Sequence, residues 1–126
     1  MIGPPTLVIV AEYTMPRPER KARGMTPFTS AFRTSGHDVF DLRLNSHSRL
    51  DPIHALLQAI AAGADEALML DPRGFVASCN STNFFIVRGG ELWTSTGAYS
   101  FKGITQASVV AAWRDAGGTA RECDYT

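Results

Sequence analysis

A run of six small or polar residues between two apolar stretches is the part of the sequence best equipped for chemistry. Residues 78–83 read Ser-Cys-Asn-Ser-Thr-Asn and carry hydroxyl, thiol and amide groups. Such groups donate and accept hydrogen bonds but supply no lasting charge at neutral pH. A solvated connection whose side chains bond their own backbone would have the same composition. The run therefore indicates either a polar binding loop or an ordinary connection.

A second candidate lies just before the last helix that the pattern predicts. Gly103, Ile104 and Thr105 lead into apolar residues that recur at helical spacing. The first N–H groups of a helix have no intrahelical partner and lie at the positive end of its dipole, so such a start can bind an anion. Thr105 is also an ordinary N-cap residue, because its hydroxyl can accept a backbone N–H. The spacing leaves both interpretations open.

The polar run belongs to residues 63–94, which are predicted to form three short strands joined by two turns. Asp71-Pro72-Arg73-Gly74 places Pro and Gly where a type I turn prefers them. Gly89-Gly90 tolerates positive φ and suits the two-residue turn of a β-hairpin. The chain is therefore expected to reverse direction at both points and to hold the polar run between apolar strands.

A first helix is predicted to precede these strands. Asp51 is a preferred N-cap, Pro52 is favoured at the first helical position, and Gly63 is a natural stop. The side expected to face the core carries Ile53, Leu57, Ile60 and Ala64. His54 lies off that side and has no metal-binding partner at helical spacing, and the three histidines do not form a ligand set.

A second helix is predicted from near Thr105 to about Ala116, with Gly117-Gly118 ending it. Its expected buried side consists of Val109, Val110, Trp113 and Ala116. Further strands are predicted over residues 6–12, 25–33 and 119–125, and residues 38–44 are expected to be a strand or an extended segment. Residues 14–24 carry two prolines and four basic side chains without a period, which indicates an exposed loop.

Length and charge limit the classes of function. A chain of 126 residues is the size of one domain, and its twelve basic residues balance its twelve acidic ones. No excess of positive charge draws it to nucleic acid or to an anionic membrane surface. The early apolar run is six residues long, which is too short for a membrane span. Cys79 and Cys123 are too few for a disulfide scaffold, so we expect free thiols and a cytoplasmic location.

The order of several short motifs closely resembles the class IV aminotransferases, the branched-chain and D-amino acid transaminase family that uses pyridoxal 5'-phosphate (PLP). The matching pieces are Gly63-Ala64-Asp65-Glu66-Ala67, Asn83-Phe84-Phe85 and Gly103-Ile104-Thr105. The resemblance runs from about Thr6 to the end of the chain. It implies an α+β fold like the larger PLP domain of that family, a mixed sheet or partial barrel with two packed helices. Residues 1–126 are then expected to be a single, partial unit without the family's smaller N-terminal domain and last strands.

The resemblance also implies a cofactor site. Gly103, Ile104 and Thr105 are expected to bind the PLP phosphate through backbone amides, as the helix start already indicated. Asn80, Ser81 and Thr82 are expected to lie beside the cofactor ring or its phosphate. PLP is expected to be held without a covalent bond if it binds at all, because the chain departs from the family's pattern at two positions.

The first departure concerns the lysine that forms a Schiff base with PLP and then moves a proton. The family places it in a K-x-x-N-x-L pattern, where this chain has Asn45 and ends the pattern at Leu50. An amide nitrogen is not basic, and the chain's two lysines, Lys21 and Lys102, lie elsewhere. The second departure is Ser78, which occupies the position of the glutamate that keeps the ring nitrogen protonated. A serine supplies no charge to hold that proton.

Three functions remain open from the sequence. The first is a PLP-dependent transaminase that moves an amino group between an amino acid and a 2-oxo acid. The second is a non-catalytic remnant that binds PLP or a related phosphate ligand, or that acts as an assembly partner. The third is a structural fragment without a ligand. Ancestry favours the first, whereas the missing lysine favours loss of turnover. Unpaired sheet edges favour a homodimer or larger assembly.

Overall fold

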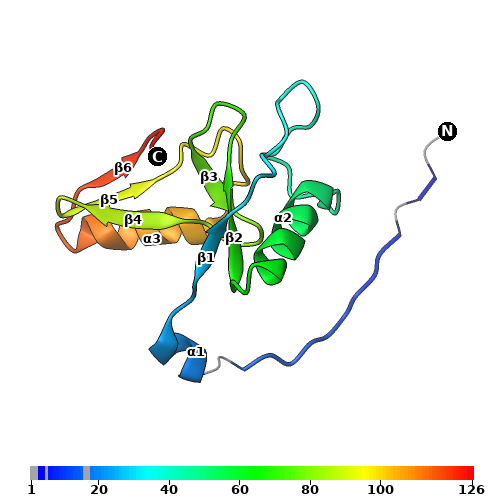
Figure 1. Cartoon of the computed structure of the whole chain (residues 1–126), viewed down its shortest axis with the longest axis horizontal. Coiled ribbons are helices and arrows are strands. Elements are labelled where there is room, and N and C mark those ends of the chain that lie inside the picture. Colours follow the sequence, from blue (N-terminus) through cyan, green and yellow to red (C-terminus); the bar gives the residue numbers. More distant parts are fainter. Residues whose placement is uncertain (1–2, 5, 16–17) are drawn as a thin grey trace.

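The structure, a computed structural model, describes residues 3–4, 6–15 and 18–126 and consists of two three-stranded sheets, each with a long helix beside it (Figure 1). The predicted α+β class is confirmed. The strands divide between two mixed sheets, and a short third helix precedes them. In chain order the elements are α1 (Pro18–Arg23), β1 (Pro27–Thr29), α2 (Leu50–Ala61), β2 (Glu66–Leu70), β3 (Val76–Cys79), β4 (Phe85–Arg88), β5 (Glu91–Thr94), α3 (Ile104–Asp115) and β6 (Ala120–Glu122).

The first sheet has the order β1-β2-β3, with β1 parallel and β3 antiparallel to β2. Alternate residues of β2 are buried, and Ala67 and Met69 lie against α2. The α2 residues that face them are Ala55 and Ala59, both fully buried. Small side chains on the helix let its backbone approach the sheet closely, so methyl groups and one methionine form this core.

The prediction for the buried side of α2 is wrong. Ile53, Leu57 and Ile60 are exposed, while Ala64 packs at the margin of the core. Nearly every residue of α2 is apolar, so the 3.6-residue period fits the alanine side as well as the side with large residues. Asp51 is not the N-cap either, because the helix begins at Leu50 and the Asp51 carboxylate accepts the hydroxyl of Ser35. The stop is confirmed, since Gly63 has φ +74° just after the helix end.

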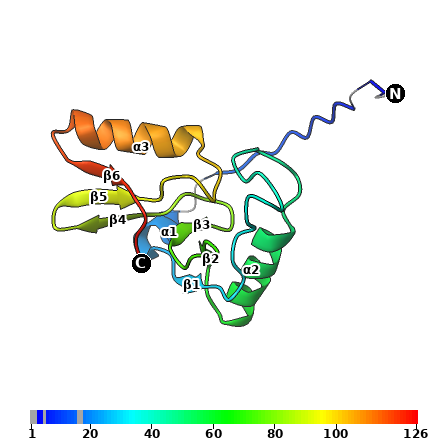
Figure 2. The same cartoon turned by 90° about the horizontal axis from the view of Figure 1, so that it is seen from above.

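The second sheet has the order β4-β5-β6, and α3 covers one side of it (Figure 2). The predicted hairpin is confirmed: β4 and β5 pair across Gly89 and Gly90, whose φ angles are +58° and +81°. Both glycines adopt the left-handed values that a type I′ turn needs. In α3 the buried residues are Gln106 and Val110. The predicted span is nearly right, but Ala116 is exposed and lies after the helix end.

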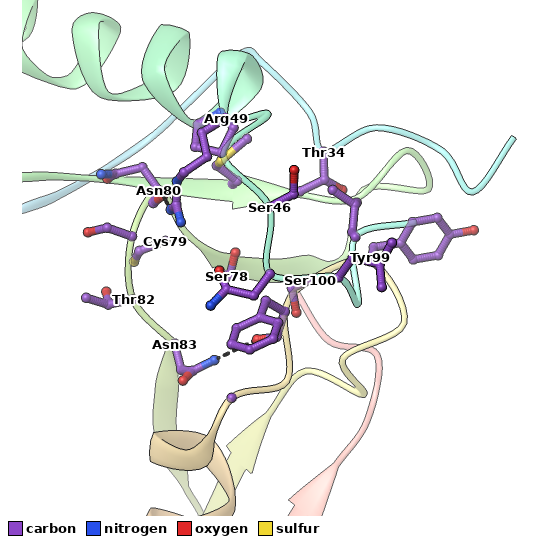
Figure 3. Close-up of a pocket in the computed structure, with 18 of the residues that line it drawn as sticks. Thr34, Ser46, Arg49, Ser78, Cys79, Asn80, Thr82, Asn83, Tyr99 and Ser100 are labelled. Carbon is purple, nitrogen blue, oxygen red and sulfur yellow. Dashed lines mark hydrogen bonds between the residues drawn. The ribbon is translucent and has the colours of Figure 1, made fainter. Parts of the chain in front are cut away.

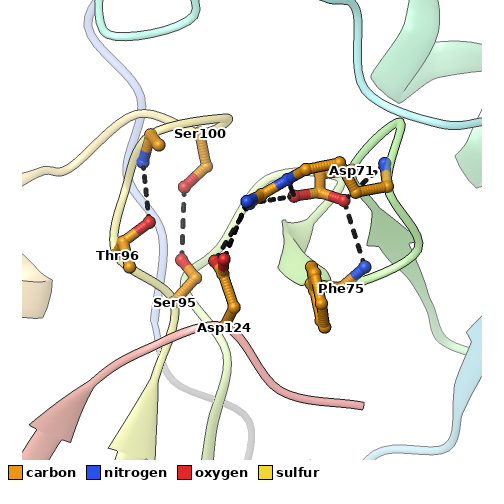
Figure 4. Close-up of polar contacts among 8 residues, drawn as sticks. Asp71, Phe75, Ser95, Thr96, Ser100 and Asp124 are labelled. Carbon is orange, nitrogen blue, oxygen red and sulfur yellow. Dashed lines mark hydrogen bonds and ion pairs between the residues drawn. The ribbon is translucent and has the colours of Figure 1, made fainter.

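Arg73 links the two sheets through ion pairs. Its guanidinium bonds Asp71 at the β2–β3 turn (2.6 Å) and Asp124 after β6 (2.8 Å), as Figure 4 shows for the two carboxylates. The same group lies over the rings of Phe75 and Tyr99. The predicted turn is confirmed by a bond from the Gly74 N–H to the Asp71 carbonyl. The turn therefore carries both the chain reversal and the link between the sheets.

Five other sequence predictions need correction. Residues 6–12 form no strand: they run as an exposed extended arm away from the sheets, because no strand in the described part of the chain pairs with them (Figure 1). The strand expected over 25–33 is only β1, and residues 14–24 include the helix α1. Residues 38–44 are turns, since the Asp41 carboxylate accepts the N–H of Arg43. The polar run also divides the middle strand, so residues 63–94 hold four strands.

Candidate functional site

A cavity of about 450 Å³ opens where the first turns of α2 and α3 meet the end of β3. This volume lies in the range of small-molecule sites. Figure 3 shows its polar side chains arriving from three parts of the chain: the irregular segment before α2, the strand β3 with the loop after it, and the loop before α3. Residues from distant parts of the sequence therefore line one hollow.

The cavity brings together the residues that the sequence analysis selected. Asn45, Ser78 and the segment from Gly103 to Thr105 all line it. Ser78 belongs to β3 and pairs across the sheet with Met69, whose side chain is another part of the wall. The position without a lysine and the helix start expected to hold a phosphate thus belong to one site.

The polar run after β3 lines the cavity, but much of its hydrogen bonding is structural. The Asn80 side-chain oxygen accepts the Ala67 N–H (2.8 Å) and the Asn80 N–H donates to the Ala67 carbonyl (3.0 Å), which fixes the end of β3 to β2. The hydroxyls of Ser81 and Thr82 donate to Glu66 at 3.0 and 3.4 Å. These three side chains shape the rim of the cavity, and their hydrogen bonds go mainly to the protein itself.

Hydrogen bonds of two side-chain amides, those of Gln106 and Asn83, support the start of α3. The buried Gln106 donates to the Ser95 carbonyl (3.0 Å) and accepts from Asn83 (3.3 Å). Gly103 at the N-cap offers no side chain, so no side-chain cap bonds the first turn. Because the first N–H groups of a helix lack intrahelical partners, the backbone here keeps donors available at the edge of the cavity. The helix dipole adds a partial positive charge at the same point.

Two further residues in the cavity wall were missed by sequence reasoning. Arg49 donates to the Asn80 carbonyl (2.8 Å) and supplies the one formal charge among the described lining residues. Thr34 is 8% exposed, and its hydroxyl is buried without a partner in the described part of the chain. Thr34 lines the cavity as a residue, but its hydroxyl is shielded from it. Neither residue lies in a motif, and only the fold brings them to the site.

Groups that transfer protons near neutral pH are absent from the described lining residues. Those residues include no Lys, Asp, Glu or His. The Cys79 thiol also lines the cavity, but burial, aided by the negative charge of Glu66, raises its pKa to about 11. It therefore stays protonated at neutral pH. The wall offers hydroxyls, amides, one guanidinium and backbone N–H groups, which bind and orient but do not exchange protons with a ligand.

The two lysines lie outside this wall. Lys102 lies shortly before the start of α3 and forms an ion pair with Glu122 of β6. Its stem also lies against Gly97, in the loop that follows β5. Lys21 lies on the exposed helix α1. Neither amine is among the groups that line the cavity.

Comparison with known proteins decides the ancestry of this arrangement. The family model described as Amino-transferase class IV matches residues 2–126. The chain belongs to the class IV aminotransferase family. The resemblance inferred from the motifs is thereby confirmed.

Curated relatives of this family member include branched-chain aminotransferases. A putative branched-chain-amino-acid aminotransferase of Methanocaldococcus jannaschii is 34% identical over 117 residues, which cover 91% of this chain and 40% of that protein. The branched-chain-amino-acid aminotransferase of Pseudomonas aeruginosa is 33% identical over 93 residues, 73% of this chain and 30% of its own length. The chain therefore spans well under half the length of these relatives.

Solved structures of the family agree with the fold. The branched-chain aminotransferase of the archaeon Thermoproteus uzoniensis, solved with norvaline, superposes with a TM-score of 0.78 at 30% identity, covering 82% of this chain and 35% of that one. An aminotransferase from Brucella abortus bound to PLP superposes with a TM-score of 0.78 at 30% identity, covering 82% of this chain and 38% of that one.

Among the described helices of the present chain, none is long and apolar enough to cross a membrane.

Proposed function

We propose that this chain binds PLP, or a closely related phosphorylated ligand, without a covalent bond and does not by itself catalyse transamination. One observation carries the proposal. The cavity unites the uncapped start of α3 with Asn45 and Ser78, and its described lining residues include no lysine, histidine or carboxylate. The site keeps groups that hold an anion and lacks groups that move protons.

The donors present suit the phosphate of such a ligand. Gly103, Ile104 and Thr105 would hold it through the backbone N–H groups of the α3 start, aided by the helix dipole. Arg49 adds a positive charge that favours an anion. Asn80, Ser81 and Thr82 would contribute the rim.

Covalent attachment is where the residues do not suit the cofactor. When bound in an enzyme, PLP supplies an electron sink for chemistry at the carbon next to an amino group. Asn45 has an amide whose nitrogen is not nucleophilic, so it can donate or accept a hydrogen bond only. Ser78 can hydrogen-bond a ring nitrogen but supplies no negative charge to keep it protonated. Both side chains can orient the ligand, and neither can activate it.

A second candidate function is favoured by family membership. The relatives named above are branched-chain aminotransferases, so amino-group transfer between an amino acid, of branched-chain type, and a 2-oxo acid is the activity to test. In that case a nucleophilic amine from outside the described cavity wall must reach the ligand. A structural fragment that binds no ligand is the third possible function.

Under either of the first two functions, we expect residues 1–126 to act as a single, partial domain. We also expect the protein to lie in the cytoplasm and to form a homodimer.

Equilibrium binding separates these possibilities. Isothermal titration would compare PLP with pyridoxal, which lacks the phosphate, and the same samples would be assayed for transamination. Binding of PLP, clearly weaker binding of pyridoxal and no turnover are expected. Absence of binding would leave the structural fragment, and turnover that depends on PLP would establish the enzyme.

A pair of threonine variants tests the site itself. Thr105→Val removes the hydroxyl of a lining residue at the α3 start at nearly constant volume and is expected to weaken PLP binding by about tenfold, the value of one hydrogen bond. Thr119→Val, an exposed threonine before β6, is the matched control and should bind PLP like the unmodified protein. Equal affinities for the two variants would remove the Thr105 hydroxyl from the proposed site.

A further inference from the structure

Arg49 places a positive charge at the side of the cavity away from the α3 start. Figure 3 shows Arg49 beside the first turn of α2 and Asn83 on the opposite side of Ser78. Asn83 donates to Gln106 in the first turn of α3, so it marks the α3 side of the cavity. The backbone donors of α3 and the Arg49 guanidinium therefore lie at two separate places in the wall, with the neutral Ser78 between them.

The charge of Arg49 is not balanced inside the cavity. Its guanidinium donates to a neutral acceptor, the Asn80 carbonyl (2.8 Å), and none of the ion pairs among the described residues includes it. Asp51, two residues further along, accepts the Ser35 hydroxyl and is not part of the described wall, which contains no carboxylate. A positive charge in such a wall attracts an anionic group of a ligand.

The guanidinium can still bind a planar anion through two parallel hydrogen bonds. It has five N–H donors in a fixed fork, and the bond to Asn80 uses one donor of Nη2. The two oxygens of a carboxylate match that fork. Arg49 is exposed, so a ligand can reach it. The α2 backbone adds little, because Asp51 lies in the first turn and Pro52 has no N–H. The side chain therefore determines which group binds here.

We propose that the ligand of this cavity carries a carboxylate as well as a phosphate, with the carboxylate bound by Arg49 and the phosphate by the start of α3. The inference rests on the proposed function, because it concerns the ligand of the same site. An aldehyde serves a cofactor where an amine attacks it, and Asn45 supplies no such amine. A phosphorylated pyridine carboxylic acid, in which a carboxylate replaces the aldehyde of PLP, matches the charges of the wall better than PLP itself.

Three ligands with the same ring and the same phosphate test the proposal by isothermal titration. At one ring position PLP carries an aldehyde, pyridoxine 5'-phosphate an alcohol and 4-pyridoxic acid 5'-phosphate a carboxylate. The unmodified protein is expected to bind the carboxylate about fivefold more tightly than the alcohol, the upper value for an exposed ion pair. Equal affinities for these two ligands would overturn the inference.

An arginine variant identifies the group that prefers the carboxylate. Arg49→Met keeps a long side chain without its charge and is expected to bind the carboxylate and the alcohol equally. Loss of the bond to the Asn80 carbonyl would lower both affinities together, so their ratio reports the charge alone. Arg43→Met is the matched control, because Arg43 is exposed, pairs with Asp41 and lies outside the described wall. A preference that survives in Arg49→Met would overturn the assignment to Arg49.

A salt titration of the unmodified protein gives a measurement that needs no variant. Salt weakens the attraction of both phosphates alike, so the ratio of the two affinities should fall toward one only if a second charge is bound at an exposed group. A ratio that stays constant would contradict an ion pair with Arg49. Binding without preference for the carboxylate would leave the proposed function intact, whereas absence of binding by all three ligands would overturn both.

Discussion

The helices α2 and α3 have the same length and begin at the same cavity, yet they present different chemistry to it. Each has twelve residues and no side-chain cap. The first turn of α2 carries a carboxylate, Asp51, and a proline without an N–H group, so it offers an anion little. The first turn of α3 carries no acidic residue and has its backbone donors available. A shared position at a cavity therefore does not give two helix ends the same capacity to bind an anion.

The two helices also pack differently. On α2 the alanines meet the sheet and the large residues face outward. On α3 a buried glutamine and Val110 face the sheet, and the glutamine bonds the loop before it. The α2 contact is therefore apolar and close, whereas the α3 contact depends partly on satisfied polar groups. We infer that α2 contributes mainly to stability and that α3 contributes to the ligand site.

The largest effect on stability is expected where α2 meets its sheet. Met69→Ala removes the largest side chain of this core and leaves a cavity, which should cost about 2–5 kcal/mol of unfolding free energy. Urea denaturation followed by circular dichroism measures the loss. Ile60→Ala, on the exposed side of α2, is the control and should change the unfolding free energy of the monomer by about 0.5 kcal/mol or less. Similar losses for both variants would show that the two sides of α2 are not as different as described.

A smaller effect is expected at the buried amide of α3. Gln106→Met keeps the approximate volume but leaves the Ser95 carbonyl without its donor, which should cost about 1–3 kcal/mol. The same change removes the bond from Asn83, so PLP affinity should also fall as the α3 start loses its support. Titration calorimetry and urea denaturation measure the two effects. A stable variant with unchanged affinity would mean that Gln106 does not position the helix start.

A rise to alkaline pH is expected to lower the free energy of unfolding gradually. In the folded state the pKa of Cys79 is about 11 and that of Tyr125 about 12, in both cases because of burial. The unfolded chain releases these protons at lower pH, so the stabilisation is complete below about pH 8.5 and is lost as pH rises toward 11. The urea midpoint should fall between about pH 8 and about pH 11, with a shallower fall for Cys79→Ala. Parallel curves for the two proteins would exclude Cys79 as a cause.

The features that could be predicted from the sequence are those decided by neighbouring residues. The turns at Asp71–Gly74 and Gly89-Gly90, and the helix ends at Gly63 and Gly117, depend on local φ preferences and are predicted correctly. The buried side of α2 could not be predicted, because its alanines and its larger apolar residues both recur at helical spacing, so the period alone does not decide which of them face the sheet. Its orientation follows from which residues let it approach the sheet.

Other errors arose where a distant partner, or its absence, decides the structure. The apolar run over residues 6–12 has strong strand propensity but no strand to pair with in the described chain. The Asp51 carboxylate binds Ser35 in preference to capping its own helix. For the site, Ser78 and the α3 start, which the motifs selected, line one cavity, whereas Arg49 and Thr34 reach it only through the irregular path of residues 30–49. No periodicity or motif marks such a path.

Reduction with borohydride tests most directly whether this site binds without a covalent bond. The unmodified protein and Asn45→Lys would each be incubated with PLP, treated with borohydride, and examined by absorbance and intact mass. The unmodified protein should bind PLP yet keep its own mass, whereas Asn45→Lys should gain one reduced PLP adduct, located by peptide mapping at position 45. An adduct on Lys21 or Lys102 of the unmodified protein, or Asn45→Lys that binds PLP but forms no adduct, would contradict the account.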